Sequence, residues 1–516
     1  MAGARHSLAD HGLGALFGHA HGDGEHDHDH DHDLPGAEPD AEPATLLSLG
    51  LDIGSSSTQA ALSRLSLHGA GFGRHAHGEL LYVSPVMATP FRGQAIDEDA
   101  LWALLEKLFR EVGVAPDAID TGAVILTGAA ARRENAAALA ARLSEAVGDV
   151  VCAAAGDHME ARLAAYGSGA VAASREGGGR RLLLIDVGGA TTKLVLIDGG
   201  EVLSTAALEV GGRLLVVDRE DRVTRLEPWG ARHAAAADVA WSLGEAIAPS
   251  SRALVADVMA RLVLQVAKAA VHGEAAPAEA AATMRTLPLT VAGPIDGVMV
   301  SGGVGEYVYG RETRDFNDLG RTLGRALRRR LDQDPLGAPL LEPTERIRAT
   351  VLGASRHTVQ MSGDTLYLSS HAALLPRKNL PVLRLSLDLS GTIRPNELAA
   401  AIRGRLAQMD DASDLALSMS WGGEPSHARL LALARGLADG FKQRIAEGRP
   451  LYLLLDGDAA ASLGAILREE VGTPVEVLVI DGVCLGELDF IDLGRIRLPS
   501  RAIPVTVKSL LFGAAS

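Results

Sequence analysis

The chain has 516 residues, of which 47% are hydrophobic and 3% aromatic, and its formal net charge is −16. This length exceeds what one hydrophobic core organises, so we expect two or three domains. The acidic balance and the scarcity of aromatic residues exclude the basic, stacking-rich surface that nucleic-acid-binding proteins use. Two cysteines, Cys152 and Cys484, cannot build a disulfide framework, and neither has a zinc-type spacing.

No stretch of the sequence approaches the roughly eighteen apolar residues of a membrane span, and the first residues lack the apolar region of a secretory signal. We therefore expect a cytoplasmic protein with no membrane partner. The one basic cluster, residues 325–331, is expected to form the solvated face of a helix.

Residues 1–43 differ in composition from the rest of the chain. They hold ten acidic residues against the single Arg5, and their histidines alternate with aspartates at His26, His28, His30 and His32. Imidazoles bind zinc, nickel or copper, but this segment has few large apolar residues that could fix the geometry of a site. We expect a disordered tail, which either binds transition metals weakly or serves only as a solubilising extension.

From residue 44 the pattern becomes that of an α/β protein. The expected elements are strands at 44–53 and 58–67 around a serine-rich turn, a helix at 100–114, a strand at 122–128, and helices at 129–148 and 157–173. The glycine run 177–179 is the best internal boundary. We therefore expect a first domain over 44–178.

A second domain is expected over 179–369 and a third over 370–516. The second contains a hairpin at 184–200, an apolar segment at 207–218, a helical region at 234–284, and strand-glycine-helix junctions at 297–310 and 348–360. The third alternates strands at 379–389, 450–458, 475–483 and 503–512 with helices at 397–409, 429–445 and 461–471. A partner-binding role suits this extra α/β domain best.

The first two domains begin with the same motif, a strand, a turn that contains aspartate and glycine, and a second strand. LDIGSSSTQAAL begins at residue 51 and LIDVGGATTKLVL at residue 184, so that Asp52 aligns with Asp186, Gly54 with Gly188 and Thr58 with Thr192. A glycine bend lets backbone N–H groups approach an anion, hydroxyls can donate to phosphate oxygens, and an aspartate can hold hydrated magnesium. One such turn is ordinary turn chemistry, but two aligned copies point to a clamp on nucleotide phosphates.

The residues expected to contact the phosphates are Gly54, Ser55, Ser56, Ser57, Thr58, Gly188, Gly189, Thr191 and Thr192. A further glycine turn follows the strand that ends near residue 301, and it contains Gly302, Gly303 and Gly305. Glycines at this place can bring the backbone close to an adenosine group.

The motifs LDIGSSST, LIDVGGATT, VMVSGGVGE and RATVLGAS, in this order, resemble the two phosphate loops, the adenosine loop and the second connecting element of the ATPase superfamily that holds actin, heat-shock chaperones and sugar kinases. ILTGAAARRENAAALAARL is similar to the first connecting element. More closely, ILTGAAARRENA, SGGVGEYVYG and DFIDLGR resemble the ethanolamine utilization protein EutA family, over about residues 46–512. The resemblance implies two actin-like (ribonuclease H-like) ATPase halves followed by a C-terminal α/β domain.

This resemblance also implies a function. Members of the family are reactivating chaperones that use ATP and Mg²⁺ to expel damaged cobalamin from inactivated ethanolamine ammonia-lyase, so that intact adenosylcobalamin can enter. Asp52 and Asp186 match the carboxylates that order magnesium through water, and Gly302, Gly303 and Gly305 match the adenosine loop. Ala190 departs from the glycine-rich second phosphate loop, and its methyl group is tolerated there if its φ is negative.

Two acidic residues are candidates for activating the hydrolytic water. Asp157 and Glu160 both lie in the region where related ATPases place an acid. Glu160 is equally explained as a helix-face charge near an N-terminus, where it favours the dipole, and the sequence does not choose between the catalytic and the structural interpretation.

Two other functions stay open. A small-molecule kinase would need a carboxylate base beside an acceptor hydroxyl, and an actin-like filament or scaffold protein would need surfaces for assembly. Oligomeric state and residence in a bacterial microcompartment are also open.

The tail yields a first testable prediction. Because residues 1–43 have little apolar surface to pack on a core, their deletion is expected to leave ATP affinity unchanged and to remove most weakly bound transition metal. Calorimetric titration of both forms with ATP and with Zn²⁺ measures the two effects. Loss of ATP affinity on truncation would show that the tail is structural.

Overall fold

A computed structural model describes residues 44–54, 57–68, 75–85, 87–92, 95–119, 121–127, 135, 138–139, 142, 149–289, 293–334, 336–343, 356–361, 366–409, 414–483, 485–495 and 503–510. The chain divides into two units, Met1–Glu42 and Pro43–Ser516, and all described residues belong to the second. The histidine-rich tail, Ser55, Ser56, most of the expected helix 129–148 and the motif RATVLGA lie outside the described residues.

The first sheet has the strand order β3-β2-β1-β7-β8, with β4 paired to β2. Its strands are β1 (Ala44–Ile53), β2 (Ser57–His68), β3 (His75–Val83), β4 (Met87–Ala88), β7 (Thr121–Thr127) and β8 (Asp149–Ala155). β1, β2 and β3 are antiparallel neighbours, whereas β7 and β8 run parallel to β1. Helix α1 (Glu98–Val112) contributes Leu101, Leu105 and Leu108 to the same core as Leu49 and Leu51.

The second sheet repeats this arrangement. Its strand order is β11-β10-β9-β14-β15, formed by β9 (Arg181–Val187), β10 (Thr192–Asp198), β11 (Glu201–Leu208), β14 (Gly297–Ser301) and β15 (Leu340–Leu341). Again the first three strands are antiparallel, and the last two run parallel to the first. Because order and direction agree in both sheets, the hairpins aligned in the sequence occupy equivalent places in the fold.

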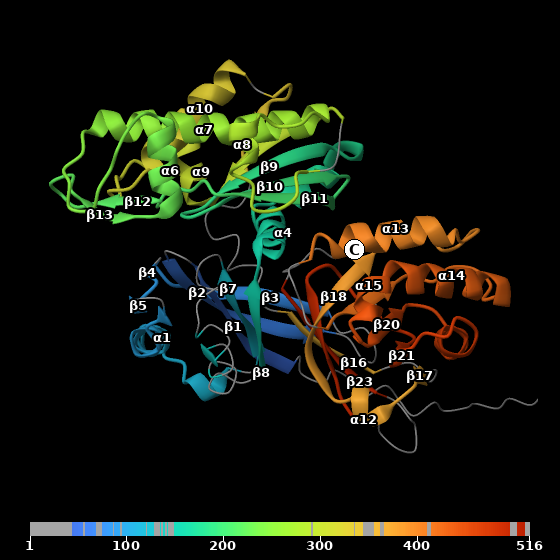
Figure 1. Cartoon of the computed structure of the whole chain (residues 1–516). Helices are drawn as coiled ribbons and strands as arrows, with labels where there is room; N and C mark the ends of the chain where they lie inside the picture. The colour runs from blue at the N-terminus through green and yellow to red at the C-terminus, as the bar shows by residue number, and fades with distance from the viewer. Residues whose placement is uncertain are drawn as a thin grey trace, which may run out of the picture. The chain divides into compact units, whose positions relative to one another are not determined.

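Helices of the second half cover this sheet. They are α6 (Pro228–Ala236), α7 (Pro249–His272), α8 (Ala278–Ala281), α9 (Gly302–Val308) and α10 (Gly320–Gln333). Figure 1 shows α7 and α10 lying side by side, in agreement with their shared apolar core. The helical region expected at 234–284 is three helices, because Pro249 starts a new helix and Gly273, with a φ of +67°, ends it.

The third sheet has eight strands in the order β16-β23-β22-β18-β19-β20-β21-β17. They are β16 (Arg356–Met361), β17 (Leu366–Leu368), β18 (Arg377–Leu385), β19 (Ala416–Met419), β20 (Leu451–Leu455), β21 (Val477–Ile480), β22 (Asp489–Leu493) and β23 (Pro504–Ser509). The four central strands, β18 to β21, are parallel, and the helices α13 (Pro395–Leu406), α14 (His427–Gly440), α15 (Lys442–Ala446) and α16 (Ala460–Ala465) connect them.

One sequence expectation is wrong here. The junction expected at 348–360 was to enter a helix, but its described part is strand β16, in which Thr358 and Val359 pair with β23. β-Branched residues suit a sheet better than a helix. The partner strand lies about 150 residues away in the sequence, and local patterns do not report pairing over such a separation.

Helix α4 (Asp157–Gly167) is shared by all three sheets. Ala161, Ala164 and Ala165 pack in the core that holds Leu182 and Val195 of the second sheet. On another face, α4 contributes to a core with the first and third sheets, whose members are Ala123, Ile125, Ala155, Leu163, Leu488, Phe490 and Leu510. We expected α4 in a domain that ends at residue 178, but it also packs on the second sheet, which begins after that residue. We keep the domain boundaries as a proposal.

Helices long and apolar enough to span a membrane are absent from the described residues.

Candidate nucleotide site

Each of the two aligned aspartates is held by a hydroxyl from the neighbouring parallel strand. Thr127 Oγ1, at the end of β7, donates to Asp52 Oδ1 at 3.2 Å. Ser301 Oγ, at the end of β14, donates to Asp186 Oδ1 at 2.6 Å. The repeat therefore extends to the groups that orient the carboxylates. Sequence reasoning missed both hydroxyls, although each ends a strand that it had predicted.

Lys193 lies beside these carboxylates and was also missed. In the β9–β10 hairpin it is directly opposite Asp186, and its side chain is 1% exposed. Its Nζ lies 2.6 Å from Glu160 Oε1 and donates to Thr191 Oγ1 at 2.5 Å. A lysine within an otherwise apolar strand, TKLVLI, was the available signal, because a buried ammonium needs partners.

The structure separates the two candidates for water activation. Both begin α4, as the sequence predicted. Asp157 Oδ2 pairs with Arg285 Nε at 2.9 Å, and the same guanidinium contacts Glu209. Glu160 instead faces Lys193, and its charge acts on both Asp52 and Asp186. Glu160 Oε2 is buried and has no hydrogen-bond partner among the described residues.

The carboxylates are desolvated and repel one another. Burial, with the charge of Glu160, raises the pKa of Asp52 to about 7, although Thr127 and Lys193 oppose this shift. Burial likewise raises the pKa of Asp186 and that of Glu160. Three carboxylates face a single ammonium, so the donor set suits a divalent cation that would supply the missing positive charge.

Two hydroxyls expected to reach phosphate are used inside the protein. Thr89 Oγ1 donates to Gly54 O at 2.8 Å, so Thr58 is the donor in the 3.0 Å bond between Thr58 Oγ1 and Thr89 Oγ1. Thr192 Oγ1 donates to Val210 O at 2.7 Å. Both threonines are fully buried. They hold the hairpins in shape, and neither hydroxyl proton is free for a phosphate.

The second phosphate loop is in close contact with the segment 211–213. Gly212 N donates to Gly188 O at 2.9 Å, and Arg213 N donates to Gly189 O at 2.6 Å. A Cβ on Gly211 would lie 2.4 Å from Gly189 O, so a side chain there would push the loop away. The φ of Ala190 is not positive, so its methyl group is tolerated at this position of the loop.

The candidate adenosine loop starts α9. Gly302 has a φ of +79°, and a Cβ there would lie 2.4 Å from Val187 O at the end of β9. Gly303 is partly exposed, whereas Gly305 is buried, where a Cβ would lie 3.2 Å from Val300 O. Gly302 and Gly305 thus have a packing role in holding α9 against the sheet, whether or not a nucleotide is bound.

Metal binding by the tail histidines His26, His28, His30 and His32 concerns residues outside those described. Within the described part of the chain, no three His, Cys, Asp or Glu side chains are grouped as direct ligands of a metal ion. For Asp52 and Asp186, contact through water stays the prediction.

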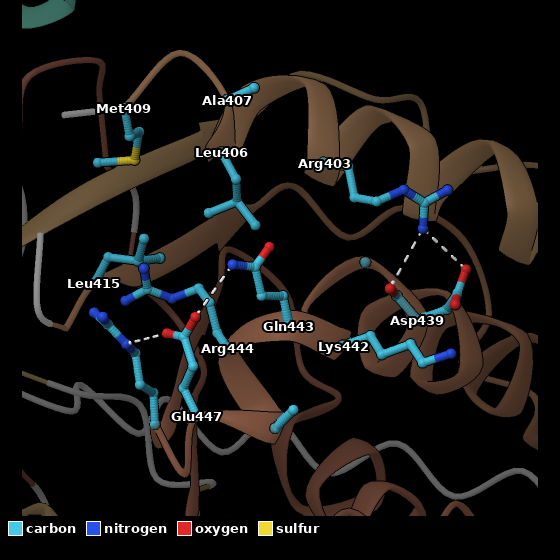
Figure 2. Close-up of a pocket in the computed structure, with 13 residues that line it drawn as sticks. Arg403, Leu406, Ala407, Met409, Leu415, Asp439, Lys442, Gln443, Arg444 and Glu447 are labelled. Atoms are coloured by element: carbon cyan, nitrogen blue, oxygen red, sulfur yellow. Dashed lines mark hydrogen bonds and ion pairs between the residues drawn. The ribbon is translucent and has the colours of Figure 1, made fainter. Parts of the chain in front are cut away.

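A pocket of about 920 Å³ lies in the C-terminal domain, and none of its lining residues belongs to the candidate nucleotide site. Figure 2 shows Leu406 and Met409 near one end, with Arg403 directed toward Asp439. Arg403 Nη1 and Asp439 Oδ2 are 3.0 Å apart. The pocket is formed where α13 meets α14 and α15.

Comparison with known proteins gives the family. The family model described as "Ethanolamine utilisation protein EutA" matches residues 44–513. The chain belongs to this family. The resemblance to this family seen in the sequence motifs is thereby confirmed. The expected α/β fold is confirmed as well, because two sheets of equal strand order are followed by a third, C-terminal sheet.

Two curated relatives are similar over almost their whole length. The ethanolamine ammonia-lyase reactivase EutA of Salmonella typhimurium is 34% identical over 486 residues, which cover 90% of this chain and 98% of the relative. The protein of the same name from Escherichia coli K12 is 34% identical over 487 residues, with the same coverage of both chains.

Similar solved structures are more distant. The activator of 2-hydroxyisocaproyl-CoA dehydratase from Clostridium difficile, with bound ADPNP, is 15% identical, with a TM-score of 0.30, and the match covers 59% of this chain and 91% of that one. The ethanolamine utilization protein EutJ from Carboxydothermus hydrogenoformans is 13% identical with a TM-score of 0.28, and the match covers 60% and 89%.

The paired aspartates yield the second prediction. Asp186→Asn keeps the size of the side chain and its bond from Ser301 but removes the charge. We expect this variant to fold and bind nucleotide while its barrier to ATP hydrolysis rises by about 2–4 kcal/mol, as for the loss of one electrostatic contact. Asp52→Asn is expected to behave similarly. Phosphate release and thermal melting, with and without Mg·ATP, separate catalysis from folding, and turnover at the parent rate would leave the aspartates as turn formers.

Proposed function

We propose that this protein reactivates inactivated ethanolamine ammonia-lyase by coupling ATP hydrolysis to the exchange of damaged cobalamin for intact adenosylcobalamin. The observation that carries this proposal is the 34% identity over 98% of the length of two relatives that are named ethanolamine ammonia-lyase reactivase. The kinase and filament alternatives have no comparable support.

In the proposed ATP site, the second loop, Gly188, Gly189 and Thr191, lies against the phosphates together with Gly54 of the first loop. Asp52 and Asp186 would hold Mg²⁺ through water, and the ion would supply positive charge beside the phosphate oxygens. Thr127 and Ser301 keep each carboxylate turned toward this position. Gly302 and Gly303 lie along the adenosine group.

Glu160 is the proposed general base. The water oxygen bonds to the γ-phosphorus, the bond from that phosphorus to the β–γ bridging oxygen breaks, and Glu160 Oε2 accepts the water proton. This oxygen is buried and lacks a partner among the described residues, whereas Oε1 is occupied by Lys193. Asp157 has the same pattern, with Oδ2 paired with Arg285 and Oδ1 buried without a partner among the described residues. We favour Glu160 because it contacts Lys193 and its charge acts on Asp52, whereas Asp157 shares its arginine with Glu209.

Helix α4 also supplies a connection to the C-terminal domain. Arg162, two residues after Glu160, has Nη1 at 3.1 Å from Glu487 Oε2 and donates from Nη2 to Gln408 Oε1 at 3.0 Å. Arg405 contacts the same Glu487, and Gln408 Nε2 donates to Leu203 O at 3.1 Å. We propose that the C-terminal domain binds the lyase and responds to nucleotide through these contacts.

The proposed activity is tested by reconstitution. Ethanolamine ammonia-lyase inactivated with cyanocobalamin is mixed with this protein, ATP, Mg²⁺ and free adenosylcobalamin. Recovery of lyase activity that needs ATP is expected, with a non-hydrolysable ATP analogue as the control. No recovery of a lyase that regains activity after its cobalamin is removed and replaced by other means would contradict the proposal.

The connection to the C-terminal domain gives a further prediction. Glu487→Gln weakens the contacts of two arginines, so we expect ATP turnover to stay within about 2-fold of the parent while the rate of lyase reactivation falls about 10-fold or more, since such coupling energies are about 1–3 kcal/mol. The matched control is Glu397→Gln, which removes an exposed ion pair with Arg394 at the start of α13, the helix that also carries Arg405, and is expected to change neither rate. Equal loss of both rates in Glu487→Gln, or of neither, would contradict the coupling.

A further inference from the structure

The repeated hairpins differ in charge at the position opposite the aligned aspartate. Lys193 is opposite Asp186 in the second hairpin, and Gln59 is opposite Asp52 in the first. Gln59 is buried as well, and its Nε2 donates to Ser84 O at 3.1 Å. A neutral amide therefore fills this place in a hairpin of the same form, so the fold of the hairpin does not require an ammonium.

The surroundings of Lys193 indicate what its charge serves. Two of its three donors have close acceptors, Glu160 Oε1 at 2.6 Å and Thr191 Oγ1 at 2.5 Å. Glu160 belongs to α4, whereas Thr191 belongs to the candidate phosphate loop and is 3% exposed. The ammonium thus joins the helix that carries the carboxylate to the loop that would hold the phosphates.

This contact fixes which carboxylate oxygen is available. Oε1 of Glu160 is bound by the ammonium, and Oε2 has no partner among the described residues. A glutamate without such a contact could rotate its carboxylate plane about the last bond and direct neither oxygen at the loop, since that torsion is broad. The lysine therefore restricts Glu160 to one orientation relative to the loop.

We infer that Lys193 is a positioning residue for ATP hydrolysis, which holds Glu160 against Thr191 so that Oε2 faces the attacking water. The inference rests on the nucleotide part of the proposed function and does not depend on the identity of the partner protein. The first hairpin has no glutamate to position, which explains why an amide suffices at Gln59. Direct binding of phosphate by Lys193 is the competing role, and the two predict different kinetics.

The test compares Lys193→Gln, which installs the residue of the first hairpin, with Glu160→Gln and with the double variant, by steady-state ATP hydrolysis and by binding of a non-hydrolysable ATP analogue. We expect Lys193→Gln to lower kcat about 100-fold, as for a misplaced catalytic group, with KM and analogue affinity within about 2-fold of the parent. In the Glu160→Gln background the same substitution is expected to cause no further loss, because its effect acts through Glu160.

Two more variants complete the design. Gln59→Leu, at the equivalent position, is expected to keep kcat within about 2-fold of the parent. Lys193→Arg keeps the buried charge, so it preserves the test if Lys193→Gln fails to fold. Its planar guanidinium displaces Glu160, and we expect kcat to fall about 10-fold with unchanged KM. Melting temperatures confirm folding.

Three results would overturn the inference. Independent, multiplicative losses in the double variant would show that Lys193 does not act through Glu160. A raised KM with unchanged kcat would assign it to phosphate binding, and parent-like kinetics of a folded Lys193→Gln or Lys193→Arg variant would leave it as a structural cation. The parent's lyase reactivation, measured separately, tests the proposed function without bearing on this result.

Discussion

The packing of helix α4 is the constraint on which the rest of the structure depends. Its small residues, Ala161, Ala164 and Ala165, allow close approach to the second sheet, while Leu163 lies in the core shared by the first and third sheets. A helix that is buried on two faces cannot shift against one sheet without disturbing the others, because protein interiors are close-packed. Its polar groups are therefore held at fixed positions relative to all three sheets.

Those polar groups lie at the two places where function is proposed. Glu160 faces the aspartates and Lys193, and Arg162, about half a turn further on, is paired with Glu487 of the C-terminal domain. Arg162 is 6% exposed, and breaking a buried ion pair costs free energy, so the pair between Arg162 and Glu487 is expected to stay formed. A change at the nucleotide would reach the C-terminal domain through a rigid element and not through a flexible linker.

The sequence predicted the parts of the fold that local patterns encode. The hairpins around Asp52 and Asp186, helix α1 and three of the four parallel strands of the C-terminal domain, β18, β20 and β21, follow from periodicity and turn residues, whereas the short β19 was not predicted. The placement of the aspartates followed from the repeat. The strands β16 and β22 were not predicted, because they are defined by pairing with β23 across long separations. The domain limits were drawn at a glycine run, which does not reveal that α4 packs on both sides of it.

The candidate site was predictable in its backbone and less so in its side chains. Thr127 and Ser301 contact the carboxylates only after the parallel strands pair, so no spacing in the sequence connects them to Asp52 or Asp186. Lys193 lies opposite Asp186 in the predicted hairpin, but its contact with Glu160 depends on the packing of α4. Thr58 and Thr192 look like phosphate donors in the motif and are turned inward by Thr89 and by the carbonyl of Val210. Which side of a hairpin a hydroxyl faces depends on tertiary partners.

Hydrogen–deuterium exchange with and without a non-hydrolysable Mg·ATP analogue tests the coupling through α4 most directly, since exchange reports local opening along the backbone. The account predicts that the analogue changes exchange in the phosphate loop at 186–192, in α4, and in the C-terminal segments around Arg405 and Glu487, and that the last of these changes is lost in Glu487→Gln. Exchange that changes in the loop and in α4 but stays the same around Arg405 and Glu487 would contradict it.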